Sequence, residues 1–237
     1  MGRSTTTFAK LKDDFGAAAL AAQRWLAETP SGTAGHGWMT LPDSPVEDIE
    51  STARWLAGYD SVIQVGIGGS ALGNLMLNQA LLDGFYNESA RKPKFYLADN
   101  PDPDKTLSIW ERVKSGRTAL VGVSKSGATA ETMTQFLWYR DRLLKNGQSD
   151  ADILVITDPE RGIFRAFAGG SRCRVMSFPP RSAAVIPCFA RRGSSPPPLS
   201  ASTRGAACGA AAMKKFLTEE RSFDDNRPQA SRHPPAA

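Results

Sequence analysis

Two short segments of the chain carry the residue types that could bind an anion. One is Gly-Ile-Gly-Gly-Ser at 66–70, directly after the apolar run 61–65, and the other is Ser-Lys-Ser-Gly-Ala-Thr at 124–129, directly after the apolar run 119–123. Each pattern predicts a buried strand that ends in a loop, with a helix after it. Backbone N–H groups and the positive end of a helix dipole meet at such a point, which suits a phosphate group.

The second segment is the more informative, because it joins three hydroxyls to an ammonium group. Ser124, Ser126 and Thr129 could donate to phosphate oxygens while Lys125 supplies the opposite charge. The alternative is ordinary helix capping by Thr129, with Glu131 assisting. Capping alone does not require so many hydroxyls beside a lysine, so we favour phosphate binding.

The glycines of the first segment have two explanations, which the sequence leaves open. They could bring N–H groups to an anion, or they could only provide the dihedral angles of a tight strand-to-helix turn. The spacing lacks the third glycine of the dinucleotide-binding fingerprint, and no Gly-Lys-Ser/Thr of a P-loop follows it. A nucleotide site is therefore disfavoured.

The elements that would position these segments alternate regularly along the chain. The predicted strands are 61–65, 94–98, 119–123, 153–157 and 174–178, and the predicted helices between them are 70–82, 104–115, 129–146 and 160–167. This alternation indicates the α/β class, with a five-stranded parallel sheet flanked by helices. Ligands of such sheets bind beyond the carboxyl ends of the strands, where both segments lie. Two helices, 8–26 with one apolar face and 45–59, precede the sheet.

The composition argues against several classes of protein. No apolar run approaches the roughly 18–20 residues that span a bilayer, so we expect no membrane contact. Residues 1–180 contain equal numbers of basic and acidic side chains, so the net charge of +5 comes entirely from residues 181–237. A basic tail with so few aromatic residues does not indicate nucleic-acid binding. Three cysteines without metal-type spacing indicate a reduced, cytoplasmic protein and no metal site.

Taken together, the two segments resemble the glucose-6-phosphate isomerase family, which has the sugar-isomerase (SIS) fold, a flavodoxin-like three-layer sandwich. The resemblance rests on Gly-Ile-Gly-Gly-Ser-x-Leu-Gly at 66–73 and Ser-Lys-Ser-x-x-Thr-x-Glu-Thr at 124–132, and it covers roughly residues 10–180. The stretches 98–103 and 156–159 fit the same family. The resemblance implies that Gly69 and Ser70 lie beside a sugar, and that Ser124, Lys125, Ser126 and Thr129 hold its phosphate.

The resemblance also implies catalytic groups that have no counterpart in this sequence. In the family, a glutamate far downstream moves the proton between C1 and C2, and a histidine and a lysine near the C-terminus open the ring. An arginine in a Gly-Gly-Arg motif stabilises the enediolate, and neither a metal nor an organic cofactor takes part. We expect His36 and His233 to be surface side chains, so no catalytic residue is assigned.

The stretch after Pro180 loses the alternating pattern and indicates a shifted reading frame. Ser-Phe-Pro-Pro at 177–180 is what the family shows before its Gly-Gly-Arg motif, yet Arg-Ser-Ala-Ala-Val-Ile-Pro-Cys-Phe follows at 181–189. One set of codons for that run, CGG TCG GCG GCC GTT ATT CCG TGC TTT, reads as Val-Gly-Gly-Arg-Tyr-Ser-Val-Leu when it is read two bases further on. Residues 193–199 show the same offset, and the family-like pattern returns at about 209–226. The basic, proline-rich tail would then have no selected function.

The sequence therefore predicts a glucose-6-phosphate isomerase-like protein that is truncated and inactive. The expected substrates are glucose 6-phosphate and fructose 6-phosphate, in glycolysis and gluconeogenesis, and the family implies a homodimer. The alternative is a non-catalytic sugar-phosphate-binding SIS module. The predicted organisation is an N-terminal helical segment (1–60), a sugar-phosphate-binding domain (61–180) and an irregular tail (181–237) with a short helix near 210–223.

Overall fold

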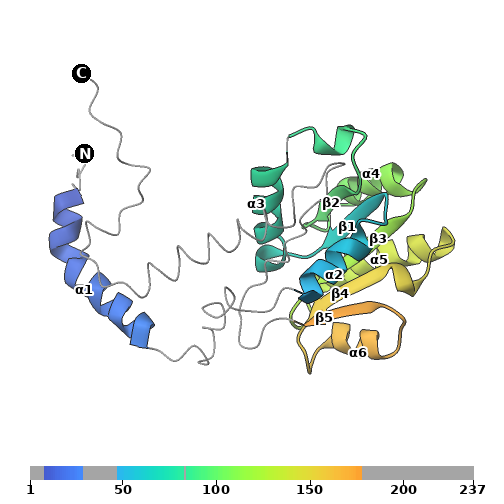
Figure 1. Cartoon of the computed structure of the whole chain (residues 1–237). Coiled ribbons are helices and arrows are strands. Elements are labelled where there is room, and N and C mark those ends of the chain that lie inside the picture. Colours follow the sequence, from blue (N-terminus) through green and yellow to red (C-terminus); the bar gives the residue numbers. More distant parts are fainter. Residues whose placement is uncertain (1–7, 29–46, 83, 178–237) are drawn as a thin grey trace, which may run out of the picture.

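The structure, a computed structural model, describes residues 8–28, 47–82 and 84–177 (Figure 1). Its centre is a parallel sheet of five strands in the order β2-β1-β3-β4-β5. The strands are β1 (Ser61–Val65), β2 (Lys94–Ala98), β3 (Thr118–Val123), β4 (Ile153–Thr157) and β5 (Arg174–Ser177). The predicted α/β class and the five-stranded parallel sheet are confirmed.

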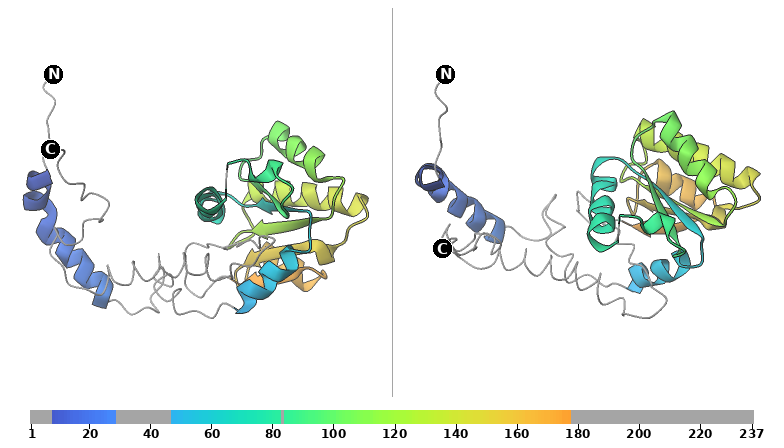
Figure 2. Two further views of the ribbon diagram at one scale, coloured as in Figure 1. Left: turned by 45° about the horizontal axis from the view of Figure 1, so that its top comes forward. Right: turned by 90° about the horizontal axis from the view of Figure 1, so that it is seen from above.

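Helices cover both faces of this sheet and complete three layers (Figures 1 and 2). The helices are α1 (Phe8–Glu28), α2 (Glu47–Leu56), α3 (Leu72–Leu81), α4 (Pro103–Val113), α5 (Ala130–Lys145) and α6 (Ile163–Gly169). Helices α4, α5 and α6 lie on one face, and α2 and α3 lie on the other. This division follows from right-handed crossovers, since the chain moves from β1 toward β2 and then back across the sheet. Short 3₁₀ turns occupy Gly68–Ser70 (η2), Tyr86–Glu88 (η3) and Asp150–Asp152 (η4).

The core has two halves, one on each side of the sheet. Under α4, α5 and α6 lie strand residues such as Ile63 and Leu120 together with Phe136 and Tyr139 of α5. On the other side the strands pack against the end of α2, where Leu56 is 3% exposed. Both faces of the central strands are therefore apolar, as parallel sheets require.

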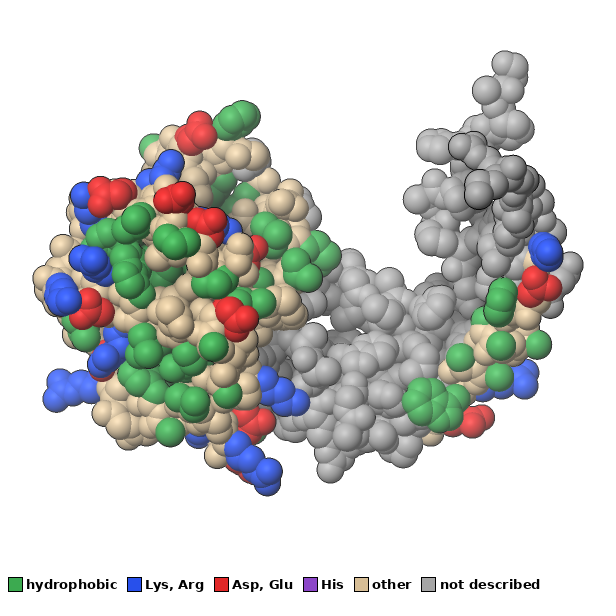
Figure 3. Space-filling model, turned by 180° about the vertical axis from the view of Figure 1, so that it is seen from behind, with side chains coloured by type: hydrophobic (Ala, Val, Ile, Leu, Met, Phe, Trp, Pro, Cys, Tyr) green, Lys and Arg blue, Asp and Glu red, His purple; other side chains and the backbone are tan. Residues whose placement is uncertain are grey.

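The outer side of the α4–α5–α6 layer keeps several apolar side chains in contact with solvent. Figure 3, seen from behind, shows hydrophobic groups gathered on this face of the sheet domain. The exposed large ones on these helices are Leu107, Leu137, Leu144 and Ile163. Among the residues described here, no helix is both long and apolar enough to cross a bilayer.

The observed helices begin and end within a few residues of the predicted ones, with two informative differences. Helix α6 begins at Ile163 rather than near 160, because the Asp158 carboxylate binds the N–H groups of Glu160 and Arg161 and holds them in a turn. Helix α1 forms as predicted, but Phe15 on its apolar face is 59% exposed. Amphipathic periodicity predicted the helix but not its packing.

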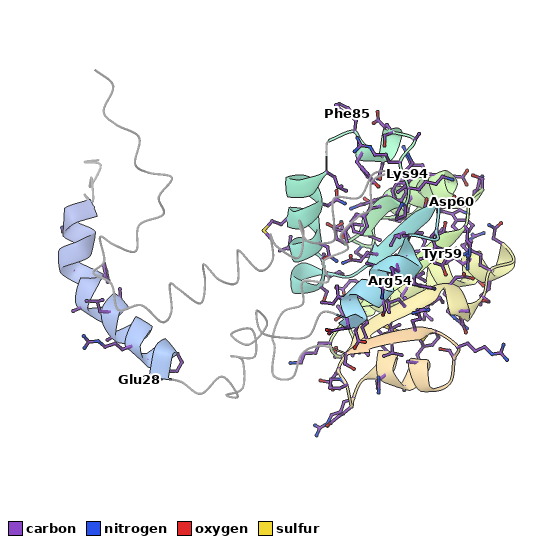
Figure 4. The ribbon with its side chains drawn as sticks, in the orientation of Figure 1. Glu28, Arg54, Tyr59, Asp60, Phe85 and Lys94 are labelled. Atoms are coloured by element: carbon purple, nitrogen blue, oxygen red, sulfur yellow. The ribbon has the colours of Figure 1, made fainter. Side chains whose placement is uncertain are left out.

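The outer edge of β2 is covered by a side chain in place of another strand. The Asn87 amide donates to the Phe95 carbonyl at 2.6 Å and accepts from the Phe95 N–H at 2.9 Å. Asn87 lies in η3, and the neighbouring Phe85, labelled in Figure 4, is 72% exposed. An amide that uses both its groups in this way imitates the backbone of a neighbouring strand.

Several sequence predictions fall outside the described residues. They concern His36, His233, the helix near 210–223 and the whole tail from 181 onward. The division into three segments with boundaries at 60 and 180 stays a prediction.

Candidate functional site

The two anion-binding candidates lie side by side at the carboxyl ends of β1 and β3. We name them the glycine loop (residues 66–70) and the serine loop (residues 124–129). Val65 pairs with Gly122 in neighbouring strands, so the loops leave the sheet next to each other. The strand order reverses between β1 and β3, since β2 lies on one side of β1 and the remaining strands on the other. Such a switch point is where open α/β sheets bind their ligands.

The serine loop uses its own hydroxyls to hold its backbone. The Ser124 Oγ accepts the Gly127 N–H at 3.0 Å, and the Ser126 Oγ accepts the Ala128 N–H at 3.1 Å. Two N–H groups that could have faced an anion are thus bound internally. The hydroxyl protons, however, remain available for donation, because each hydroxyl is here an acceptor. Ser124 is buried, whereas Lys125 and Ser126 are exposed.

Thr129 does not cap α5 with its side chain, which was the alternative to phosphate binding. It occupies the N-cap position with an extended backbone, but its hydroxyl makes no capping hydrogen bond. The first helical bond runs from the Met133 N–H to the Thr129 carbonyl, so the helix itself does not use the N–H groups of residues 130–132. The alternative of ordinary capping is therefore wrong for Thr129. Its exposed hydroxyl and the open first turn of α5 face the same end of the sheet as the serine loop.

The serine loop is fastened to the loop that follows β4. The Lys125 carbonyl accepts the Asp158 N–H at 3.2 Å and the Thr157 hydroxyl at 3.3 Å, and the Ser126 carbonyl accepts the Ile163 N–H at 3.0 Å. A Cβ added at Gly162 would lie 2.4 Å from the Ser126 oxygen. The two loops therefore touch backbone to backbone, and glycine is required at 162, where φ is +104°.

The glycine loop is a tight 3₁₀ turn that leads into α3. The Ser70 N–H donates to the Ile67 carbonyl at 3.1 Å, and Gly68 has a φ of +57°. Gly66 lies close to two backbone carbonyls. An added Cβ would be 2.8 Å from the Ser70 oxygen and 3.1 Å from the Val123 oxygen. Gly69, by contrast, has open space around it and is exposed. Turn geometry thus explains Gly66 and Gly68, while the exposed Gly69 stays a candidate for contact with a ligand.

The charges around the site are held by local hydrogen bonds. The backbone N–H of Glu160 leads the interactions that lower the pKa of the Asp158 carboxyl, and the Arg161 N–H and the positive charge of Lys125 add to it. Lys105 forms an ion pair with Asp99 beside the end of β2. In the part of the chain that the structure describes, no group of three or more metal-ligating side chains comes together.

Sequence reasoning missed the residues that hold the two loops in place. Thr157 and Asp158 lie in a stretch that fits the family pattern, but nothing in the pattern assigned them to the serine loop. Gln64 and Asn74, below the glycine loop, carried one weak signal: a glutamine between two apolar residues of a strand. A buried amide needs partners, so that glutamine indicated a polar contact near the site.

The fold and these two loops define a class: three-layer α/β proteins with a glycine-rich and a serine-rich loop at the switch point of a parallel sheet. Residues 51–156 match the family model of phosphoglucose isomerase. The chain is 37% identical over 147 residues to a glucose-6-phosphate isomerase of Carboxydothermus hydrogenoformans, a match that covers 59% of this chain and 32% of the relative. It is 34% identical over 154 residues to that of Rubrobacter xylanophilus, covering 61% of this chain and 35% of the relative.

Two solved structures share the fold. A hypothetical protein of Thermus thermophilus superposes with a TM-score of 0.60 at 26% identity, covering 89% of this chain and 48% of that one. A glucose-6-phosphate isomerase of Chlamydia trachomatis gives a TM-score of 0.53 at 17% identity, covering 87% and 43%. The resemblance inferred from the two loops is confirmed: the chain is similar to phosphoglucose isomerases over residues 51–156. It spans about a third of the length of these curated relatives.

Proposed function

We propose that the chain binds glucose 6-phosphate or fructose 6-phosphate, with the phosphate on the serine loop and the sugar beside the glycine loop. The observation that carries this proposal is the meeting of the two loops at the switch point of the sheet. Ser124 and Ser126 accept backbone N–H groups, which leaves their protons for phosphate oxygens, and Lys125 and Thr129 are exposed beside them. The curated relatives are named for a reaction of such a substrate.

The second part of the proposal is that this chain does not catalyse the isomerisation. The base, the ring-opening groups and the enediolate-binding arginine that the resemblance implies come from segments after the fifth strand. We interpret residues 181–208 as a stretch read in a shifted frame, in which these segments would be lost. General acid–base catalysis contributes typically about 10²–10⁴-fold, so a sugar phosphate bound without a base reacts slowly.

Calorimetry with glucose 6-phosphate tests the binding site. We expect saturable binding to the full chain and at least a tenfold weaker affinity for Ser124→Ala and for Lys125→Ala, since a hydrogen bond to a charged group contributes about 1.5–3 kcal/mol. Ser115→Ala, exposed after α4, and Lys145→Ala, exposed at the far end of α5, are the matched controls and should bind as the parent does. Unchanged affinity in both site variants would remove the serine loop from the proposal.

A coupled assay with fructose 6-phosphate tests the missing chemistry. We expect product to form no faster than in a buffer blank, even at a concentration that saturates the site in calorimetry. Turnover well above the blank would show that a base is present and would overturn the second part of the proposal.

Light scattering on the same sample tests the homodimer that the family resemblance implies, and fractionation of cells tests the cytoplasmic location.

A further inference from the structure

Strand β1 contains one polar residue that its apolar neighbours do not explain. Gln64 is fully buried between Ile63 and Val65, on the side of the sheet that faces α2 and α3. A buried amide without hydrogen bonds is costly, and an apolar residue would satisfy a strand of this kind. The contacts of the Gln64 amide therefore indicate what the residue does.

The Gln64 side chain connects α3 with the last residue of the glycine loop. Its Nε2 donates to the Ser70 carbonyl at 2.8 Å, and its Oε1 accepts from the Asn74 Nδ2. The direction of this relay is fixed, because a carbonyl can only accept: Gln64 must turn its NH₂ to Ser70 and its oxygen to Asn74. Asn74 then turns its own oxygen away.

The far end of the relay is unpaired. The Asn74 Oδ1 is buried and has no hydrogen-bond partner among the residues that the structure describes, and Asn74 as a whole is 5% exposed. Leaving such an acceptor unpaired costs stability. A pair of amides that served packing alone would not carry this cost, whereas residues near functional sites often do.

The same Ser70 carbonyl is confined from the other side by the backbone of Gly66. A Cβ at Gly66 would lie 2.8 Å from that oxygen and 3.1 Å from the Val123 oxygen, and Val123 is the residue from which the serine loop starts. The Ser70 carbonyl thus accepts from the Gln64 amide and lies close to Gly66, which also lies close to the residue before the serine loop.

We propose that Gln64 and Asn74 are positioning residues for the sugar end of the site. The inference rests on the proposed function and deepens it. The serine loop binds the phosphate, and the hydrogen bonds of Gln64 and Asn74 fix the position of Ser70 beside the sugar. The relay touches the glycine loop only, so its loss should affect a sugar phosphate and leave inorganic phosphate alone. A purely structural role would weaken both ligands alike.

The test compares two ligands on the full chain by calorimetry: glucose 6-phosphate and inorganic phosphate. Gln64→Met and Asn74→Leu keep the approximate shape and remove the polar groups. We expect about tenfold weaker binding of glucose 6-phosphate, the change that a lost hydrogen bond of ordinary strength produces, and inorganic phosphate affinity within about twofold of the parent. Gln148→Met is the control, because Gln148 bonds both backbone groups of Thr118 at the amino end of β3, away from the two loops.

A further variant keeps the test decisive if Gln64→Met or Asn74→Leu fails to fold. In Gln64→Glu the carboxyl, when protonated, donates to Ser70 and accepts from Asn74, and burial favours this neutral form. The ratio of the glucose 6-phosphate affinity to the inorganic phosphate affinity should therefore stay near that of the parent at a pH of about 5. It should fall as the pH rises and the carboxyl ionises. Circular dichroism of each variant checks the fold.

The possible results separate the two proposals. A parent chain that binds neither ligand overturns the proposed function and this inference with it. A parent that binds both ligands, with Gln64→Met and Asn74→Leu unchanged, overturns the inference alone. Equal weakening of the binding of both ligands, or a Gln64→Glu variant whose affinity ratio stays below that of the parent even at a pH of about 5, also contradicts a positioning role.

Discussion

Gly127 shows how strongly a single residue constrains the serine loop. It is buried with a φ of +63°, and an added Cβ would lie 2.5 Å from the backbone nitrogen of Phe164. Both the conformation and the contact exclude other residues, because the αL region is strained for a residue with a Cβ and backbone atoms cannot move aside. Glycine at this position joins the serine loop to α6.

Gly127→Ala should therefore destabilise the protein and weaken glucose 6-phosphate binding together. We expect a loss of about 2 kcal/mol or more in the free energy of unfolding, from αL strain together with the displaced backbone. Gly147→Ala is a matched control, since Gly147 also has a positive φ, +84°, but nothing lies within 4 Å of an added Cβ. That variant should lose only about 1 kcal/mol and bind normally. Urea unfolding and calorimetry give both numbers, and equal losses would contradict the steric argument.

The sequence predicted where the loops lie but not how they are built. Apolar runs before residues 66 and 124 were sufficient to place both loops at strand ends, because parallel strands align their carboxyl ends. The bonds from Ser124 to Gly127 and from Gln64 to Ser70 depend on side-chain directions that spacing does not encode. The absence of a side-chain cap at Thr129 was contrary to its residue type, since threonine is a favoured N-cap.

At the scale of elements, α2 is attached to the sheet by a network at the amino ends of the strands. Tyr59, just after α2, donates its hydroxyl to the Asp152 carboxylate at 2.9 Å, and Arg117 bonds the same oxygen at 3.0 Å. The Arg117 guanidinium also lies 4.5 Å from the centre of the Tyr59 ring. Figure 4 shows Tyr59 and Asp60 where α2 meets β1, and the Asp60 carbonyl accepts the Lys94 N–H that begins β2.

This network should make stability depend on pH in the acid range. Burial alone would raise the pKa of Asp152, but hydrogen bonds from Ser149, Tyr59 and Arg117 outweigh it and hold the pKa below its ordinary value of 3.8. A carboxyl with a lowered folded pKa stabilises above its unfolded pKa, and this contribution is lost as the pH falls through the folded pKa. The free energy of unfolding should thus be level above about pH 5 and decline below about pH 4.

Two variants check the origin of that decline. Asp152→Asn should flatten it, whereas Asp141→Asn, exposed on α5, should leave it unchanged. Tyr59→Phe should cost about 1–2 kcal/mol at neutral pH, because it removes one bond to a buried carboxylate. An acid decline that is identical in the parent and in Asp152→Asn would assign it to other groups, such as Asp60, whose pKa is lowered mainly by the Lys92 ammonium.

At the scale of the whole molecule, the sequence pattern changes a few residues after β5. The alternation of strands and helices leads without interruption to Ser177, and the last family-like residues before the change are Ser-Phe-Pro-Pro at 177–180. A domain whose two core halves are both apolar up to this point is followed by a basic, proline-rich stretch. We propose that a change of reading frame accounts for this change in composition.

The gene sequence tests that explanation directly. We expect codons for residues 181–189 that give Val-Gly-Gly-Arg when read two bases further on, and an inserted or deleted base next to them. A corrected gene should then produce a protein that converts fructose 6-phosphate. Codons incompatible with the shifted reading would refute the hypothesis. The function of residues 181–237 would then still have to be explained.

The amide of Asn87 against Phe95 has a consequence for how this sheet can be extended. The Asn87 amide occupies the outward N–H and C=O groups of Phe95, which a further strand beside β2 would need. A polypeptide that pairs with this edge must therefore first displace Asn87, and this requirement disfavours edge-to-edge association at β2.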